Sequence, residues 1–220
     1  MKRAAAAVIT TLALSLGMTG TAPAAVTRTR QLTGTQLAAA LLPATDFPVV
    51  FAPPGPPSDS GSQLENSPAR YHLATMSCDS ITLRFGREGF GETAVAATGY
   101  YAFGASSTQY TQDVYQFRTA GPASSFFRGL RAIWSRCPAF TFPTGSPRTR
   151  VSTVPPADGY AAFQDRGTGM LEGSKVNVDL LSVIAGPDVL TILSITGVQS
   201  ADPASRPLMD TLIARVLARR

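Results

Sequence analysis

The strongest structural signal in the sequence is the segment 175–196, KVNVDLLSVIAGPDVLTILSIT. Branched apolar residues fill both halves, and the tripeptide GPD at 186–188 separates them with residues typical of a turn. We therefore expect two antiparallel strands, 175–184 and 189–196, joined by a tight turn. Apolar side chains stand at odd and even positions alike, which indicates burial on both faces. This hairpin is expected at the centre of a sheet.

Four more segments are rich in β-branched and aromatic residues and read as strands. Segments 93–104 and 108–119 flank a turn sequence of small residues, so they are expected to form an antiparallel hairpin. Segments 148–154 and 160–168 are the other two. Within 108–119, polar and apolar side chains alternate on both faces, and the pattern leaves the buried face undecided.

Helical periodicity is clearest in residues 122–136, where apolar residues recur at spacings of three and four and include Trp134, which we assign to the core. A short helix at 36–42 should begin with a capping box made by Thr33 and Gln36. A third helix is expected at 76–85. The closing helix should follow Asp202-Pro203 and carry a continuous apolar stripe, formed by Leu208, Met209, Leu212, Ile213, Val216 and Leu217.

This order of elements predicts an α+β fold, an antiparallel β-sheet of about six strands with flanking helices. The seven prolines within residues 43–70 disfavour both helix and sheet. They indicate an extended loop that wraps the domain, with a disordered linker as the alternative. We expect residues 33–220 to form one domain after a short N-terminal segment, 25–32.

The first 24 residues have the composition of an export signal. Lys2 and Arg3 precede an uncharged apolar stretch at 4–18, and small residues at 22–24 suit a cleavage site after Ala24. The apolar stretch is shorter than a bilayer-spanning helix needs, so a retained anchor is the weaker alternative. The protein is therefore expected to be secreted and extracellular, with no stable membrane span.

The chain has two cysteines, Cys78 and Cys137. In an exported protein such a pair predicts one structural disulfide, in place of a metal or redox site. The bond would join the helices expected on either side of the first hairpin. Closing a loop of about 60 residues is worth roughly 4 kcal/mol in the chain-entropy model.

Charge excludes a nucleic-acid-binding protein. Removal of the export signal leaves 17 basic and 14 acidic residues, and the arginines are scattered along the chain where phosphate binding needs a dense stripe. Arg215, Arg219 and Arg220 do cluster, in the last turn of the closing helix, where we interpret them as complementing the helix dipole. No partner is indicated beyond a small molecule or cell-envelope component, and a monomer is expected.

Catalytic motifs are missing from the sequence. His72 is the only histidine, no G-x-S-x-G sequence occurs, and no His/Cys spacing fits zinc. The glycines of 86–91 lack dinucleotide-binding spacing, so this segment is predicted to be a loop and no cofactor is expected. A carboxylate pair of a small secreted hydrolase stays open as an alternative. Its candidates are Glu65, Glu88, Glu92, Glu172, Asp165 and Asp179.

Tyrosines are the best candidates for a binding surface, because each offers an apolar ring with a polar tip. The alternative is ordinary packing within the sheet. The candidate ligand-binding residues are Tyr71, Tyr100, Tyr101, Tyr110 and Tyr160, with Phe103 beside them.

Several motifs together resemble a known family. They are VYQF at 114–117, IWSRC at 133–137, NVD at 177–179, the turn with Asp188 and the terminal amphipathic helix. Over residues 33–219 the chain resembles the extracellular sensor domain of PknH-type bacterial kinases and its secreted, kinase-free relatives. That resemblance implies an antiparallel sheet flanked by helices and a groove for an extracellular ligand. The sensor domain of the kinases has two disulfides, whereas this chain has one possible pair.

We therefore expect a secreted, non-enzymatic, sensor-like binding domain that accommodates a small extracellular or cell-envelope ligand in a groove beside the sheet. The alternatives are a small secreted hydrolase, which requires two carboxylates about 5 to 9.5 Å apart in a cleft, and a protein-interaction module, which requires an exposed apolar patch.

Overall fold

The computed structural model of the protein describes residues 30–48, 58–59, 71–78, 89–102, 108–137, 148–154, 160–171, 174–197 and 205–220. The predicted export signal lies outside the described residues. So do most of the predicted helix 76–85, most of the proline-rich segment and the start of the closing helix at Asp202-Pro203.

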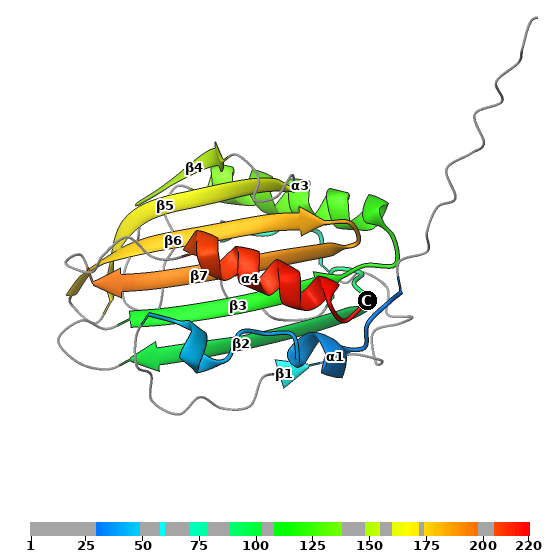
Figure 1. The fold of residues 1–220 in the computed structure, drawn as a ribbon. Coiled ribbons are helices and arrows are strands. Elements are labelled where there is room, and N and C mark those ends of the chain that lie inside the picture. The colour runs from blue at the N-terminus through cyan, green and yellow to red at the C-terminus, as the bar shows by residue number, and fades with distance from the viewer. Residues whose placement is uncertain are drawn as a thin grey trace, which may run out of the picture.

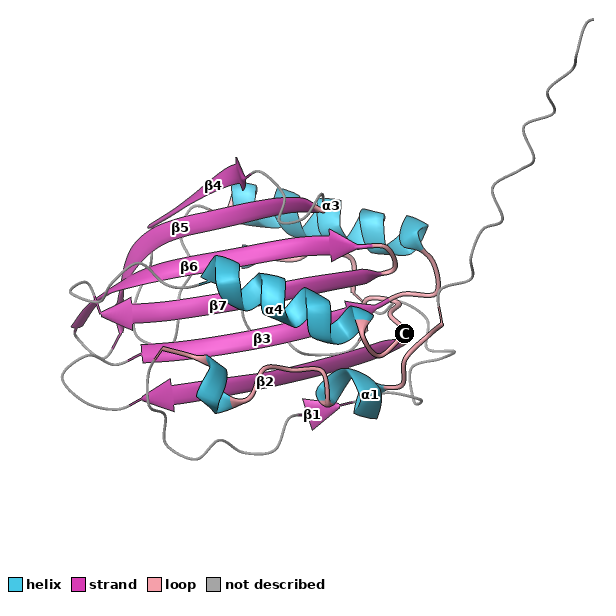
Figure 2. Cartoon of the chain, viewed as in Figure 1, coloured by secondary structure: helices cyan, strands magenta, loops and turns pink. Residues whose placement is uncertain are grey.

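Within these residues, seven strands form one antiparallel sheet in the order β1-β2-β3-β7-β6-β5-β4 (Figure 1 and Figure 2). Six of them have seven residues or more, and β1 has only two, so the predicted antiparallel sheet of about six strands is confirmed. The strands are β1 (Ser58–Asp59), β2 (Ala94–Ala102), β3 (Thr108–Gln116), β4 (Arg148–Val154), β5 (Ala161–Leu171), β6 (Ser174–Ala185) and β7 (Asp188–Gly197).

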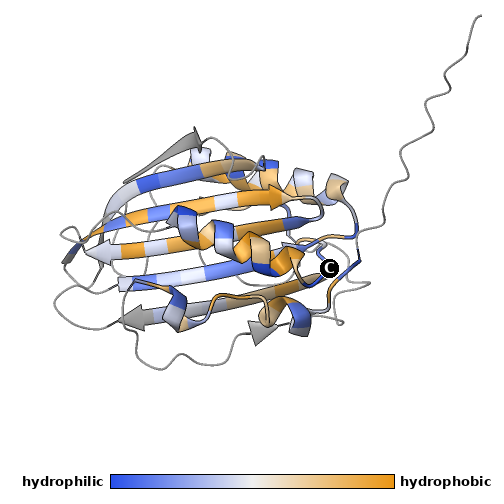
Figure 3. Cartoon of the chain, in the orientation of Figure 1, coloured by the Kyte–Doolittle hydropathy of each residue, from blue (hydrophilic) through white to orange (hydrophobic). Residues whose placement is uncertain are grey.

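The β6–β7 hairpin lies at the centre of the sheet, as its composition predicts. Strand β7 is the fourth of the seven and is buried along nearly its whole length. Gly186 makes the turn with a φ of +63°, a left-handed conformation that glycine adopts without strain. Figure 3 shows apolar residues concentrated along β6 and β7, with polar residues more frequent on the flanking strands β3 and β5.

Helices cover both faces of the sheet. Helix α4 (Ser205–Leu217) and helix α1 (Gly34–Ala38) lie on one face, and α3 (Ala120–Arg136) lies behind the sheet on the other (Figure 1). We call these the α4 face and the α3 face. Each face has its own buried apolar cluster, and Trp134 belongs to the one on the α3 face, as predicted.

Strand β3 contributes to both clusters, which explains why its pattern leaves the buried face undecided. Tyr110 and Val114 are buried on the α4 face, and Tyr115 is buried on the α3 face. Polar residues of the same strand are buried as well, because the sheet is covered on both sides. They are Gln112, Asp113 and Gln116.

Residues 30–48, which we call the strap, run across the α4 face. The side chain of Gln112 accepts a hydrogen bond from Leu42 N at 2.9 Å and donates one to Leu42 O at 2.7 Å. The Tyr100 hydroxyl also donates to Leu42 O, at 2.8 Å. Near the start of the strap, Leu32 N donates to the Gln116 side chain at 2.9 Å. Side chains of the sheet thus hold the strap by hydrogen bonds to its main-chain atoms.

Helix α1 starts as predicted, because Thr33 and Gln36 form the capping box. It ends at Ala38, four residues earlier than the predicted end at residue 42. Gln112 binds both main-chain groups of Leu42, so the backbone there is committed to the sheet and cannot continue the helix.

The arginines at the end of α4 hold the strap as well. Arg215 Nε donates to Ala40 O at 2.9 Å, Arg219 Nη2 to Ala39 O at 2.7 Å, and Arg220 Nη1 to Arg30 O at 3.1 Å. Arg220 also forms an ion pair with the fully buried Asp188. Interpreting these arginines as dipole partners of their own helix therefore missed their contacts, which are with the strap and the central turn.

The predicted disulfide is present between Cys78 and Cys137, with Cα atoms 5.5 Å apart. It attaches residues 71–78 to the end of α3. Among the described residues, no helix combines the length and apolarity needed to cross a membrane.

Candidate ligand-binding site

A hollow of about 330 Å³ opens between residues 71–74, Phe90 and the first half of α3. Most of its lining is apolar, and the polar side chains in it are those of a tyrosine, a histidine and a serine. We call it the α3 hollow. Its lining residues are Tyr71, His72, Leu73, Ala74, Phe90, Pro122, Ser125, Phe126 and Gly129.

Four kinds of contact fix the loop 71–78 that forms one wall. Tyr71 N donates to Gly89 O at 2.8 Å. The guanidinium of Arg136 donates to the carbonyls of Ala74 and Met76 at 3.3 and 3.0 Å. Leu73 packs against Gly129 so closely that a Cβ there would lie 3.1 Å from its side chain. The Cys78–Cys137 disulfide closes the far end.

The floor of the α3 hollow is a set of packed aromatic rings. Phe90 lies at the centre, with ring centroids 5.9 Å from Tyr71, 5.2 Å from Phe126 and 6.2 Å from Tyr115. Tyr115 and Phe126 are 4.9 Å apart. These separations are typical of favourable aromatic pairs. The rings that line the hollow are thus supported from beneath by the core.

Glu92 holds Phe90 in place, a role that the sequence did not reveal. Its two carboxylate oxygens accept hydrogen bonds from Gly89 N at 2.8 Å and Phe90 N at 2.7 Å. Gly89 and Gly91 have positive φ angles of 116° and 86°, which favour glycine. Residues 89–91 of the predicted glycine loop therefore fix the position of the Phe90 side chain. Residues 86–88 lie outside the described part of the chain.

The rim of the hollow is polar and basic. Ser125 lines it, and Arg128 Nη2 donates to the Ser125 hydroxyl at 3.3 Å. His72 is exposed, and its imidazole makes no hydrogen bond with the described residues.

The structure separates the predicted ligand-binding tyrosines. Tyr71 lines the α3 hollow. Tyr100 and Tyr110 are buried on the opposite face, where Phe47 packs on both rings at centroid distances of 5.1 and 5.0 Å. Burial raises the pKa of both phenols. Tyr160 packs against the same core. The side chains of Tyr101 and Phe103 lie outside the described part of the structure.

The described carboxylate candidates are also apart. Asp179 pairs across the sheet with Arg166, so Asp165 points to the other face. Glu92 precedes β2, four strands from β5, or about 19 Å at the usual strand spacing. Glu65, Glu88 and Glu172 lie outside the described residues.

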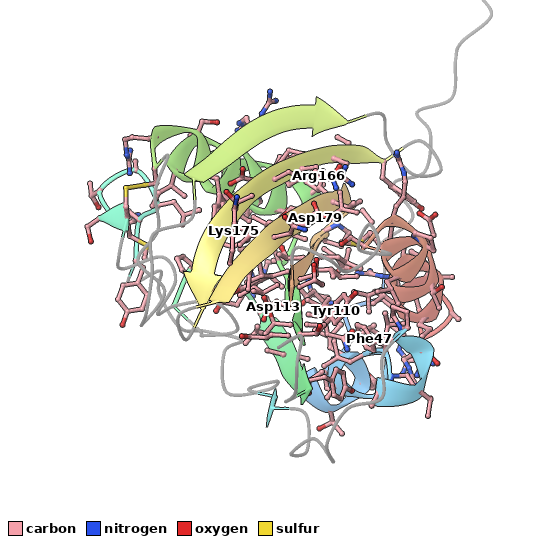
Figure 4. The ribbon with its side chains drawn as sticks, turned by 90° about the vertical axis from the view of Figure 1, so that its left-hand side faces the viewer. Phe47, Tyr110, Asp113, Arg166, Lys175 and Asp179 are labelled. Carbon is pink, nitrogen blue, oxygen red and sulfur yellow. A yellow bond between two sulfur atoms is a disulfide. The ribbon has the colours of Figure 1, made fainter. Side chains whose placement is uncertain are left out.

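Asp179 is engaged in a polar cluster on the α4 face. It is 2% exposed and accepts hydrogen bonds from Gln164 at 2.6 Å and Arg166 at 3.3 Å. Figure 4 shows Arg166 beside Asp179 on neighbouring strands, and Phe47 next to Tyr110. The negative charge of Asp179 adds to burial in raising the pKa of Tyr110.

No protein-family model matches the sequence, and no curated protein matches it. Among solved structures, the extracellular domain of PknH from Mycobacterium tuberculosis superposes with a TM-score of 0.54 and 17% identity, over 86% of this chain and 97% of that one. A protein of Mycobacterium smegmatis described as an ortholog of Rv0999 gives a TM-score of 0.42 and 12% identity, over 83% and 95%. The chain thus shares the fold of the PknH extracellular domain, which confirms the predicted resemblance.

Proposed function

We propose that the protein is a secreted, non-enzymatic, sensor-like binding domain that takes a small extracellular or cell-envelope ligand into the α3 hollow. The observation that carries the proposal is the hollow itself, with three aromatic rings in its lining and few polar groups at its rim. This combination is typical of small-molecule sites, and its volume falls at the small end of their range. A ligand of one or two rings, or a short chain, would fit.

Two further observations support an extracellular role. One is the disulfide, which is typical of proteins from oxidising compartments. The other is the fold shared with an extracellular domain. The expected export signal agrees with both and awaits its own test, which is N-terminal sequencing of protein from the culture medium.

The alternative functions receive less support. The three carboxylate candidates that the structure describes, Glu92, Asp165 and Asp179, lie on different faces or strands, so they do not make the pair that a hydrolase requires. For a protein-interaction module, Leu217 is the single large apolar side chain that is exposed among the described residues. One exposed leucine makes no patch.

Native mass spectrometry of protein purified from its own culture medium tests the proposal. Ser125→Phe fills the hollow from an exposed helix position, and Ser135→Phe places the same ring elsewhere on α3 as a matched control. We expect a co-purified small molecule on the wild type and on Ser135→Phe, and none on Ser125→Phe. Equal retention of that molecule by all three proteins would refute the α3 hollow as the site.

A further inference from the structure

Helix α3, which forms one wall of the α3 hollow, carries charge of one sign. Helix α3 contains three arginines and no acidic residue. Of the nine residues that line the hollow, none is acidic. A ligand entering this space therefore meets positive groups alone from the helix that forms its wall.

Arg128 lies at the rim of the hollow, because it contacts Ser125, which lines it. It lies one turn after Ser125 on the same side of the helix, and its one hydrogen bond with a described residue goes to the Ser125 hydroxyl. None of the described carboxylates pairs with it. A guanidinium has five N–H donors in a planar fork that matches an oxyanion. Arg128 is exposed, so most of these donors have no partner among the described residues.

The other two arginines of α3 have different roles. Arg136 uses its guanidinium to hold the loop carbonyls of Ala74 and Met76. Arg131 makes interactions of its own. His72, on the loop across from the helix, adds an imidazole that forms no hydrogen bond with the described residues.

We infer that the α3 hollow is specific for an anionic amphiphile, whose apolar ring or short chain lies on Phe90 and Phe126 while its carboxylate, sulfonate or phosphate group is bound by Arg128 at the rim. This inference rests on the proposed function and names its ligand class. An apolar body without an acidic group would leave the arginine donors to water. A cationic group would be repelled.

Two fluorescent probes with nearly the same aromatic body test the inference. 8-Anilinonaphthalene-1-sulfonate carries an anion, and N-phenyl-1-naphthylamine is its neutral counterpart. At low ionic strength we expect the sulfonate to bind the wild type more tightly by about three- to tenfold, as suits a partly solvated charge pair. Added salt should weaken the sulfonate and leave the neutral probe nearly unchanged.

Variants separate the charge from the cavity. Arg128→Gln should remove the preference for the sulfonate without changing the affinity for the neutral probe, and Arg128→Lys should restore part of it. Arg206→Gln on α4, on the other side of the sheet, is the matched control for net charge. Ser125→Phe should abolish specific binding of both probes.

The outcomes distinguish the two claims. One outcome is that both probes bind the wild type, lose binding in Ser125→Phe and keep their affinities in Arg128→Gln. In that case the anionic ligand class is wrong and the proposed function stands. If Ser125→Phe changes the affinity for neither probe, both the ligand class and the proposed function are wrong. Co-sedimentation with vesicles of phosphatidylglycerol, compared with phosphatidylcholine, identifies the source of the anion. Binding to the anionic vesicles that Arg128→Gln abolishes would assign it to a lipid headgroup, and soluble-probe binding alone to a free amphiphile.

Discussion

Asp113 is a carboxyl group placed where water does not reach. It lies in the middle of β3 on the α3 face, is 3% exposed, and stands opposite Thr191 of β7. Thr191 is already within hydrogen-bond distance of Ser182, at 3.1 Å. Burial raises the pKa of Asp113 from 3.8 to about 7. The neutral acid is thus the form that the folded protein prefers.

This shift predicts a loss of stability as the pH rises. The folded state holds the Asp113 proton between pH 3.8 and about pH 7 while the unfolded state releases it, so the free energy of unfolding should fall across this window. Asp113→Asn imitates the neutral acid. It should match the wild type near pH 4 and exceed it by on the order of 3–4 kcal/mol at pH 8. Urea unfolding at both pH values measures this, with Asp46→Asn as an exposed control, and parallel pH profiles would contradict it.

Asp188 and Arg220 form the most buried ion pair among the described residues, with side chains 0% and 8% exposed. Burial raises the pKa of Asp188, and the Arg220 guanidinium opposes that shift. Arg220→Met keeps the aliphatic stem but leaves the carboxylate unpaired. We expect a loss of about 3–5 kcal/mol at pH 7. As a control, Arg219→Met replaces an exposed arginine and should lower the free energy of unfolding by less than about 1 kcal/mol. Chemical denaturation measures both losses, and equal losses would show that the buried ion pair contributes no more than an exposed arginine.

At the scale of elements, the sequence predicts most of the secondary structure because the relevant forces are local. Strands β4 to β7 and helix α3 begin and end within about three residues of their predicted bounds, since hydrophobic period and turn residues define them. Helix α1 ends early because Gln112, 70 residues away, takes the main chain of Leu42. A side chain that binds a distant backbone leaves no local pattern in either segment.

That contact predicts a local weakening when it is removed. Gln112→Ala removes the hydrogen bond from the buried Leu42 N and one of the two hydrogen bonds to Leu42 O. This change should lower the free energy of unfolding by about 1–3 kcal/mol. Hydrogen exchange at the Leu42 amide should accelerate more than exchange in β6. Gln109→Ala, half-buried on the same strand, is the control. Unchanged protection of Leu42 would mean that Gln112 does not hold the strap.

For the whole molecule, the sequence predicts the architecture but not the site. The central hairpin, the disulfide and the α+β class follow from composition and periodicity. The α3 hollow does not, because its members come from residues 71–74, Phe90 and α3, and only the tertiary fold brings them together. Tyr71 could be proposed as a polar-tipped aromatic, but nothing in the sequence separates it from Tyr100 and Tyr110, which the fold buries on the other face.

Global stability should depend strongly on the disulfide. It spans 59 residues, so replacing both Cys78 and Cys137 with serine should lower the free energy of unfolding by roughly 4 kcal/mol. The double variant should keep its far-UV circular dichroism, because the sheet itself does not need the bond. Affinity for the sulfonate probe should fall, since one wall of the hollow loses its anchor. A double variant as stable as the wild type would contradict this role.

The position of that bond links the structure of the α3 hollow to the redox state of the compartment. In copies retained where glutathione keeps thiols reduced, the strands and helices would still form, but the loop 71–78 would lose one of the four contacts that hold it against α3. Under the proposed function, such molecules would be folded but would bind the ligand more weakly, and formation of the disulfide would restore the affinity.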